Sequence, residues 1–349
     1  MRYTEQYFDD MRLIMGNIPG LEQLHNKRIF ITGANGLICS SIVDFLMYLS
    51  LRHEYNITVY AAGRNPDRIT SRFGRFMDCK HFRYVLYDAL KEIDCSEHFD
   101  YMIHGAGNAN PAAYVAEPVE TMLANVLGIN NILSYAGKCG ARRVLYISSS
   151  EVYGKKQNTD LYKEDEYGYV DILSHRSCYP SAKRAAETLC ASYGSEYGVD
   201  TVIVRPGHVY GAAVTGSDNR ASSQFPKDVI EGRDIIMKSA GDQLRSHCYV
   251  LDCVSAIMTV LLNGKMGQAY NISNPDSVST IREIAEAFAE AGHKKVVFEN
   301  PSDAELKGYN PMSNSALAAD KLTGLGWKGC FDLKTGTRKT LEYMQAGEE

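Results

Sequence analysis

The chain has 349 residues, of which 45% are apolar and 23% charged, and its formal net charge at pH 7 is −5. These values are typical of a soluble globular protein with one large or two moderate domains, and they give no support to binding of nucleic acid or a membrane. The absence of an apolar signal segment or an 18-residue apolar run, and nine cysteines without a Cys-x2-Cys pair, predict a reduced, cytoplasmic protein with no metal site.

A glycine-rich turn follows the first strand pattern. The apolar run Lys27–Thr32 leads into Gly33 and Gly36, and apolar residues then recur at helical spacing over residues 38–49. Strand, glycine turn and helix are the context of a dinucleotide fingerprint, in which the first glycine permits the turn and the second lets the backbone approach a pyrophosphate. Cys39 holds the third glycine position, and a residue this small is compatible with the motif. A plain turn is the alternative interpretation.

The second strand pattern, Ile57–Ala62, ends in Gly63 and Arg64. An acidic residue that binds the adenosine ribose is expected at about this distance from the glycines. Arginine here can meet the 2′-phosphate of NADP, or it can stack on adenine or face solvent. The sequence leaves both interpretations open.

Further strands are expected at residues 84–87, 101–104, 144–148 and 201–204, with a helix over 117–139. This alternation predicts an α/β fold with a Rossmann-type, doubly wound parallel sheet. Such sheets bind ligands beyond the carboxyl ends of their strands. The residues that follow predicted strands are Gly33, Asp88, Gly105-Ala106-Gly107 and Ser149.

Tyr179 and Lys183 are four residues apart in a predicted helix, so their side chains share one face. An ammonium beside a phenol stabilises the phenolate, and we therefore expect the pKa of Tyr179 to fall, so that it can act as a base near neutral pH. Ser149 could hydrogen-bond the substrate alcohol that Tyr179 deprotonates. Taken alone, this spacing is common in proteins that have no such site.

The second half of the chain alternates between helix and strand patterns and has no clean linker. Residues 212–226 are polar and irregular, which suggests a substrate loop. We expect an N-terminal extension over residues 1–25 with one outer helix, an NAD(P)-binding domain over 26–205, and a smaller interleaved α/β domain over 206–349. This last domain is expected to be mainly substrate-binding, with segments that return to the first.

At this point the chain resembles the extended short-chain dehydrogenase/reductase family, in particular its NAD-dependent nucleotide-sugar epimerases, dehydratases and decarboxylases. The residues that carry the resemblance are Thr32-Gly33-x2-Gly36, Ile103–Gly107, Ser148–Gly154, Tyr179-x3-Lys183, Arg205-Pro206-x3-Tyr210-Gly211, Arg245-x3-Tyr249-Val250-x-Asp252 and Tyr270–Ile272.

The resemblance implies a transient oxidation of a sugar, usually at C4, in which Tyr179 takes the hydroxyl proton while hydride passes to the nicotinamide. Lys183 would also bind the nicotinamide ribose, and Ser149 would orient the hydroxyl. NAD is the expected cofactor, with NADP left open by Arg64. The cofactor contacts that the resemblance implies are Gly33, Asn35, Gly36, Leu37, Ile38, Arg64, Asp88, Ala89, Gly105, Ala106, Gly107, Asn125, Ser148, Tyr179, Lys183 and Pro206.

The reaction branch depends on the pair Ser150-Glu151, which is similar to that of UDP-glucuronate decarboxylases. A 4,6-dehydratase would need an acid at position 150, so Glu151 is expected to be catalytic in a decarboxylase; a role in capping nearby backbone is the alternative. Arg176-Ser-Cys-Tyr179 and Asp218-Asn-Arg220 also look like the decarboxylase subgroup.

The expected substrate is a nucleotide sugar, with UDP as the expected nucleotide. The residues expected to contact it are Asn108, Ser150, His208, Arg220 and Arg245. His208 stands where the family commonly has asparagine, and Ala212 replaces a proline, so the sugar stays open. A 4-epimerase and a nucleotide-sensing regulator are the alternatives to a decarboxylase. The helices at 117–138 and 179–195 correspond to those that pair in dimeric relatives, which implies a homodimer.

Overall fold

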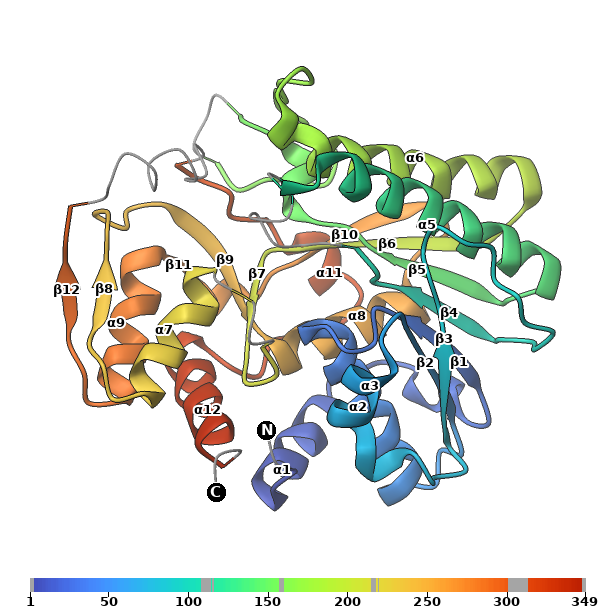
Figure 1. Ribbon diagram of the computed structural model, residues 1–349, viewed down its shortest axis with the longest axis horizontal. Coiled ribbons are helices and arrows are strands. Elements are labelled where there is room, and N and C mark those ends of the chain that lie inside the picture. Colours follow the sequence, from blue (N-terminus) through green and yellow to red (C-terminus); the bar gives the residue numbers. More distant parts are fainter. Residues whose placement is uncertain are drawn as a thin grey trace.

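The computed structural model describes residues 3–107, 114, 116–156, 160–214, 218, 220–300 and 313–346. Two units lie side by side in Figure 1, a larger one built on a wide sheet and a smaller one of helices and short strands. Within the described ranges, no helix is long and apolar enough to cross a bilayer.

The larger unit contains a sheet of seven strands that are all parallel. In spatial order the strands are β10 (Gln268–Ile272), β6 (Thr201–Pro206), β5 (Arg143–Ile147), β4 (Tyr101–His104), β1 (Arg28–Thr32), β2 (Thr58–Gly63) and β3 (Phe82–Leu86). This confirms the predicted doubly wound α/β fold. Strand β10 comes from the C-terminal half and pairs with β6, so the second half of the chain returns to the main sheet.

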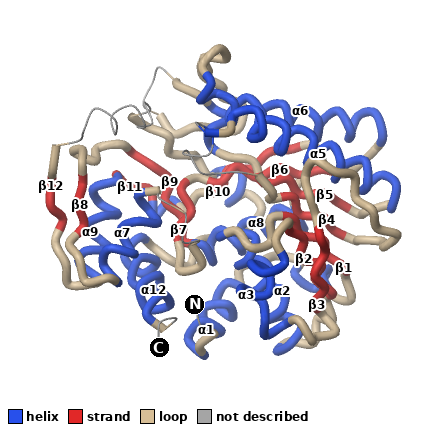
Figure 2. Tube along the Cα trace, viewed as in Figure 1, coloured by secondary structure: helices blue, strands red, loops and turns tan. Residues whose placement is uncertain are grey.

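Helices cover both faces of the main sheet, which Figure 2 shows as the red strands between two blue layers. They are α2 (Leu37–Arg52) and α8 (Val250–Asn263) on one face, and α5 (Pro118–Cys139) and α6 (Cys178–Tyr197) on the other. Because strand side chains alternate in direction, Ile29 and Ile31 join the first apolar core and Phe30 joins the second. Helix α3 (Pro66–Phe73) lies next to β2 and β3.

The smaller unit has a three-stranded sheet in the order β11 (Val278–Thr280), β9 (Leu244–Tyr249), β7 (His208–Tyr210), and a parallel pair, β12 (Val296–Phe298) and β8 (Ile235–Met237). Its helices are α7 (Ala221–Ile230), α9 (Ile281–Ala291), α11 (Asp320–Thr323) and α12 (Leu333–Gln345). Helix α9 begins at a capping box in which the side chains of Thr280 and Glu283 each bond the other's backbone N–H.

The substrate loop expected over residues 212–226 is shorter than the sequence suggested, because α7 begins at Ala221. Phe225 and Val229 lie one turn apart and are both buried, and this apolar contact stabilises the helix. Pro226, the last residue of the expected loop, lies inside α7.

The helix expected in the N-terminal extension is α1 (Glu5–Met15), and it joins the two units. Asp10 is buried, pairs with Lys339 of α12 at 3.0 Å and accepts a hydrogen bond from the Tyr343 hydroxyl. From the same helix, the Tyr7 hydroxyl donates to Asp44 of α2 at 3.3 Å. The helix therefore binds a carboxylate of the larger unit and two side chains of the last helix of the smaller unit.

Candidate active site

The turn between β1 and α2 brings the ends of two neighbouring strands into contact. Gly33 has φ +66°, and a Cβ built on it would lie 2.7 Å from the carbonyl oxygen of Gly105. The two glycines follow β1 and β4, which pair directly. A positive φ and this close approach together require glycine at position 33. Gly36 caps the amino end of α2, so the backbone N–H groups of that helix face the same edge of the sheet.

Cys39 takes part in the same packing although it departs from the glycine pattern. A Cβ on Gly105 would lie only 2.3 Å from the Cys39 sulfur, so the thiol fills the space above that glycine. Burial raises the pKa of the Cys39 thiol to about 12, which makes it a packing group with little thiolate character. The close contact between helix and strand is therefore made by Gly105 in place of a third glycine in the fingerprint.

Thr32 connects the ends of β1 and β4. Its hydroxyl accepts from the backbone N–H groups of Gly105 and Ala106, both at 3.2 Å, and lies 2.8 Å from Nδ1 of His104. Nearby, the buried Oδ1 of Asn125 has no hydrogen-bond partner among the described residues, and a Cβ on Gly107 would lie 2.9 Å from it. A buried acceptor without a partner beside a bare glycine backbone is an arrangement that a polar ligand would complete.

Tyr179, Lys183 and Ser149 meet at the carboxyl end of β5, as the sequence predicts from their positions. The Tyr179 hydroxyl hydrogen-bonds the side chains of Ser149 and Tyr114. Lys183 is buried, and its ammonium donates to the carbonyl of Ile147 at 2.9 Å. Burial lowers the pKa of Lys183 to about 8, while the nearby Glu187 carboxylate acts in the opposite direction.

The predicted direction of the Tyr179 pKa shift is wrong in this structure. Burial, together with the Glu151 carboxylate, raises the pKa of Tyr179 to about 12, and the hydrogen bonds from Ser149 and Tyr114 offset only part of that rise. The Lys183 ammonium lies 5.6 Å from the centre of the tyrosine ring because it donates to Ile147. Desolvation therefore outweighs the attraction that the spacing suggested.

Tyr114 is a site residue that sequence reasoning missed. It is buried, and its ring stacks on that of Tyr179 with centroids 4.5 Å apart and planes 9° apart. The Cys178 thiol donates to its carbonyl oxygen at 3.7 Å. Tyr114 lies 65 residues before Tyr179 in a stretch without a motif, so no local signal could have identified it.

Glu151 lies in η3 (Ser150–Tyr153), the short helix that Ser149 caps, and it forms a bidentate ion pair. Its two carboxylate oxygens accept from the two terminal nitrogens of Arg176, at 3.1 and 3.3 Å. Arg176 lies in η4 (His175–Ser177), directly before α6. The resemblance included Arg176 in a motif without giving it a role, and its spacing of three residues from Tyr179 was the available signal.

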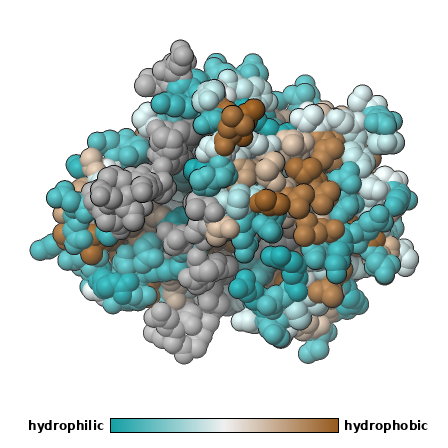
Figure 3. Space-filling view, turned by 45° about the horizontal axis from the view of Figure 1, so that its top comes forward, coloured by the Kyte–Doolittle hydropathy of each residue, from teal (hydrophilic) through white to brown (hydrophobic). Residues whose placement is uncertain are grey.

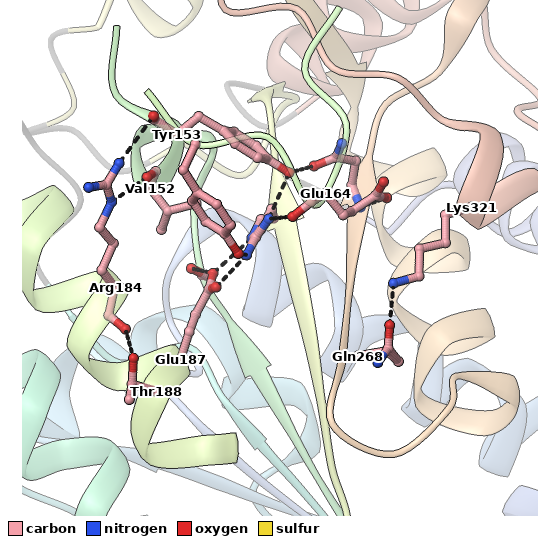
Figure 4. A network of polar contacts seen from close by, with 12 residues as sticks. Val152, Tyr153, Glu164, Arg184, Glu187, Thr188, Gln268 and Lys321 are labelled. Atoms are coloured by element: carbon pink, nitrogen blue, oxygen red, sulfur yellow. Dashed lines mark hydrogen bonds and ion pairs between the residues drawn. The ribbon is translucent and has the colours of Figure 1, made fainter. Parts of the chain in front are cut away.

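Ser148, expected to contact the cofactor, donates its hydroxyl to Glu187 at 2.5 Å. Glu187 also accepts from Nε of the buried Arg205 at 3.0 Å, and Arg205 in turn donates to the hydroxyl of Tyr153 at 2.9 Å. Figure 4 shows Glu187 and Tyr153 in this network, with Arg184 of α6 bonded to the carbonyl oxygens of Val152 and Tyr153. The network connects the end of β5 with β6, α6 and η3. It therefore holds in place the elements that carry the site residues.

Two further arginines come from the smaller unit. Arg220 caps α7 and pairs with Asp218 at 2.6 Å, and it is close enough to Tyr179 to lower its pKa. Arg245 in β9 is 2% exposed; burial lowers its pKa to about 10, and Glu151 is among its charged neighbours. His208 in β7 lies edge-on to His247, 5.8 Å between ring centres, and its Nδ1 has no partner among the described residues.

The other predicted contacts lie at the same edge of the sheet or at its margins. Asn35 belongs to the β1–α2 turn and Leu37 and Ile38 begin α2. Asp88 and Ala89 follow β3, Ser150 begins η3, Pro206 ends β6, and Arg64 is exposed after β2. Asn108 lies outside the described residues. Among those described, no group of three or more His, Cys, Asp or Glu side chains could hold a metal ion.

Comparisons with known proteins agree with this geometry. UDP-glucuronic acid decarboxylase 6 of Arabidopsis thaliana is 33% identical over 314 residues, which are 89% of this chain and 87% of the relative. UDP-glucuronic acid decarboxylase 1 of Danio rerio is 28% identical and covers 93% of this chain, with 74% of its own length matched.

Solved structures share the fold. A UDP-glucose 4-epimerase of Thermotoga maritima, crystallised with UDP-glucose, superimposes with a TM-score of 0.79 at 22% identity, over 92% of this chain and 100% of that one. A dTDP-glucose 4,6-dehydratase of Streptomyces venezuelae with bound NAD gives 0.78 at 20% identity, over 92% and 98%. The model of the NAD dependent epimerase/dehydratase family matches residues 29–273, and the chain belongs to that family.

Proposed function

We propose that this protein is an NAD-dependent enzyme that modifies a nucleotide sugar through a transient 4-keto sugar, and that its reaction is decarboxylation of UDP-glucuronate. The observation that carries the proposal is the meeting of Tyr179, Ser149 and Lys183 at the carboxyl end of β5, beside the bare backbone of Gly33 and Gly105. UDP-glucuronic acid decarboxylases among the relatives support the choice of sugar. A nucleotide-sugar 4-epimerase is the second candidate, favoured by the shared fold.

The glycine end of the site fits a dinucleotide. Gly33 and Gly105 leave no room for a Cβ, the N-terminus of α2 offers N–H groups to a pyrophosphate, and the Asn125 acceptor lacks a partner within the described chain. The solved structures that carry NAD include a dTDP-glucose 4,6-dehydratase and a UDP-glucose 4-epimerase. When bound, the nicotinamide supplies a reversible acceptor for the two electrons released from the sugar carbon.

Residues of this chain would accept the proton of the sugar hydroxyl and bind the negative charges of the substrate. Tyr179 Oη takes the proton of the C4 hydroxyl, and Ser149, already hydrogen-bonded to that oxygen, orients the alcohol. The buried ammonium of Lys183 lies 5.6 Å from the centre of the Tyr179 ring, where the carbonyl of Ile147 holds it. Arg220 and Arg245 would meet the diphosphate.

The geometry of Glu151 helps to distinguish a decarboxylase from a 4,6-dehydratase. In a 4,6-dehydratase this glutamate removes the C5 proton and a second acid protonates the leaving oxygen. Here both Glu151 oxygens accept from Arg176, and the neighbouring Ser150 carries no acid. Decarboxylation needs neither group as a base, because a β-keto acid loses CO2 once its carboxylate is held out of the carbonyl plane. We therefore expect no dehydratase activity on dTDP-glucose or GDP-mannose.

The test is incubation of the purified protein with UDP-, CDP-, GDP- and dTDP-sugars, read by mass spectrometry. A product lighter by CO2 supports the decarboxylase, a product lighter by water contradicts it, and an isomer of unchanged mass moves the assignment to the epimerase. On the sugar identified, Glu151→Gln should lower turnover strongly, because in a decarboxylase Glu151 would orient the sugar or a water although it is not needed as a base. A fall of less than about threefold, or about 0.6 kcal/mol, would remove Glu151 from catalysis and favour the epimerase.

We further propose a cytoplasmic homodimer. The nine cysteines are all free thiols, which fits a reducing compartment. Helix α5 exposes an apolar stripe of Val119, Met122, Leu123 and Leu127 beside α6, and Figure 3 shows apolar side chains gathered on the side of the molecule where these helices lie. A two-fold pairing of this face would bury the stripe. Sedimentation that finds only a 38.8 kDa species at micromolar concentration would contradict it.

A further inference from the structure

The ion pair between Arg176 and Glu151 differs from the surface ion pairs of this protein. Both of its contacts are to separate carboxylate oxygens, and the side chains are only 31% and 22% exposed. Arg12 and Asp9, by contrast, pair at one contact of 3.3 Å with side chains 68% and 65% exposed. A bidentate, largely buried pair fixes the orientation of both groups more strongly than an exposed one.

The pair lies between two elements that meet at Tyr179. Glu151 belongs to the short helix capped by Ser149, and Arg176 to the turn that precedes α6. The negative charge of Glu151 raises the pKa of Tyr179, and only burial raises it more. Arg176 is not among the main causes of this shift in the pKa of Tyr179. Arg176 therefore acts on the tyrosine through groups that neighbour it: it is bonded to Glu151, and it also lowers the pKa of Tyr114, whose ring stacks on that of Tyr179.

We propose that Arg176 is a positioning residue for proton transfer at Tyr179: by holding both oxygens of Glu151 it fixes where that anion stands and compensates its charge. Without Arg176, the carboxylate would turn freely beside the tyrosine with its charge uncompensated. The phenolate that accepts the substrate proton would then be harder to form. The inference rests on the proposed function only in taking Tyr179 as the group that exchanges the proton.

The other groups around Tyr179 do not replace this function. Ser149 and Tyr114 offer neutral hydroxyls, and the Arg220 guanidinium is already paired with Asp218. The titratable or charged groups that face Tyr179 are Glu151, Arg176, Tyr114, Arg220, Tyr146 of β5 and, from its own helix, Cys178 and Lys183. Among these, Arg176 is the partner bonded to the carboxylate that opposes the phenolate.

The experiment compares Arg176→Gln, Glu151→Gln and the double variant in the holoenzyme, through the pH dependence of kcat/KM. Arg176→Gln should move the acidic limb to higher pH by about 0.5–1 unit, because an uncompensated carboxylate raises the pKa of Tyr179. Glu151→Gln should move it to lower pH. In the Glu151→Gln background, adding Arg176→Gln should change kcat/KM less than about twofold, since its target is gone.

Arg12→Gln is the matched control for loss of an arginine from an ion pair, and it should leave the profile unchanged. An Arg176→Gln effect that is equal at all pH values, or that persists in full when Glu151 is already glutamine, would overturn the proposal. A second result would also overturn it: a double-mutant cycle in urea unfolding shows coupling between Arg176 and Glu151, but the acidic limb of the kcat/KM profile does not move. The pair would then only stabilise the fold.

A failure of the proposed function can be told apart from a failure of this inference. If the parent turns over no sugar of the panel, the ionisation of Tyr179 can still be measured by ultraviolet difference titration of tyrosinate against Tyr179→Phe. A higher pH of ionisation in Arg176→Gln than in the parent supports the proposal, and an unchanged one overturns it.

Discussion

The two ends of the candidate site are specified in opposite ways. The end beside β1 and β4 is defined by missing side chains, with Gly33 and Gly105 so close that neither accepts a Cβ. The end beside β5 is defined by charge, with a buried lysine, a glutamate held by Arg176 and two more arginines. The first end can be damaged by one methyl group and has no ionising group of its own, while the second depends on the ionisation of its side chains.

Tyr179→Phe should test the charged end most severely. The ring keeps its stacking on Tyr114, and only the hydroxyl is lost, so turnover should fall by about 10²–10⁴ while cofactor binding and the unfolding midpoint stay near those of the parent. The measurements are steady-state kinetics and titration with NAD. Turnover equal to that of the parent would remove Tyr179 from the mechanism.

Gly105→Ala should break the glycine end. Its Cβ would lie 2.3 Å from the Cys39 sulfur, and the resulting overpacking should cost about 1–3 kcal/mol in urea unfolding and weaken cofactor binding. Adding Cys39→Ala should restore much of both, because the sulfur is removed. Gly74→Ala is the control, since its Cβ meets nothing within 4 Å. Equal losses in the single and the double variant would show that the thiol is not the obstacle.

Lys183→Met should stabilise the protein while inactivating it. The pKa of Lys183 is lowered from 10.5 to about 8, so the folded chain binds this proton less tightly than the unfolded chain does. Below about pH 8 the buried ammonium destabilises the parent, and between pH 8 and 10.5 that penalty fades as pH rises. We expect a gain of about 1–3 kcal/mol at pH 7, net of the lost bond to Ile147, and a smaller gain at pH 10. A loss of stability at pH 7 would refute this.

Arg64→Ala should have the smallest effect. If Arg64 meets a 2′-phosphate, the parent will bind NADP more than about tenfold tighter than NAD, a gap of about 1.4 kcal/mol, and the variant will lose that gap. We expect NAD to be preferred and Arg64→Ala to change either affinity less than threefold. Calorimetric titration with both dinucleotides decides between the two interpretations.

The sheet and the positions of its ligand-binding edge were predictable because buried parallel strands leave local patterns. Strand β4 begins and ends where the sequence places it, and the residues that follow the strand ends do lie at one edge. The family was also predictable from motifs in the correct order, and the comparisons confirm it.

Side-chain contacts across long loops were not predictable. The spacing of Tyr179 and Lys183 places both on one helix face, but it does not show that Lys183 donates to Ile147 or that burial governs the tyrosine. Tyr114 reaches Tyr179 only through the tertiary fold. The assigned cofactor and substrate contacts of individual residues stay predictions.

The contact between α1 and α12 has a consequence for folding during translation. Asp10 and its partner Tyr343 are 333 residues apart, so a ribosome that starts at the N-terminus exposes this carboxylate long before its partners exist. Strand β10, which completes the main sheet, also arrives after most of the chain. Contacts of such high sequence separation slow folding, and the larger unit must remain incomplete at one edge of its sheet until translation is almost finished. The nascent protein should therefore depend on chaperones more than a chain whose first domain closes on itself.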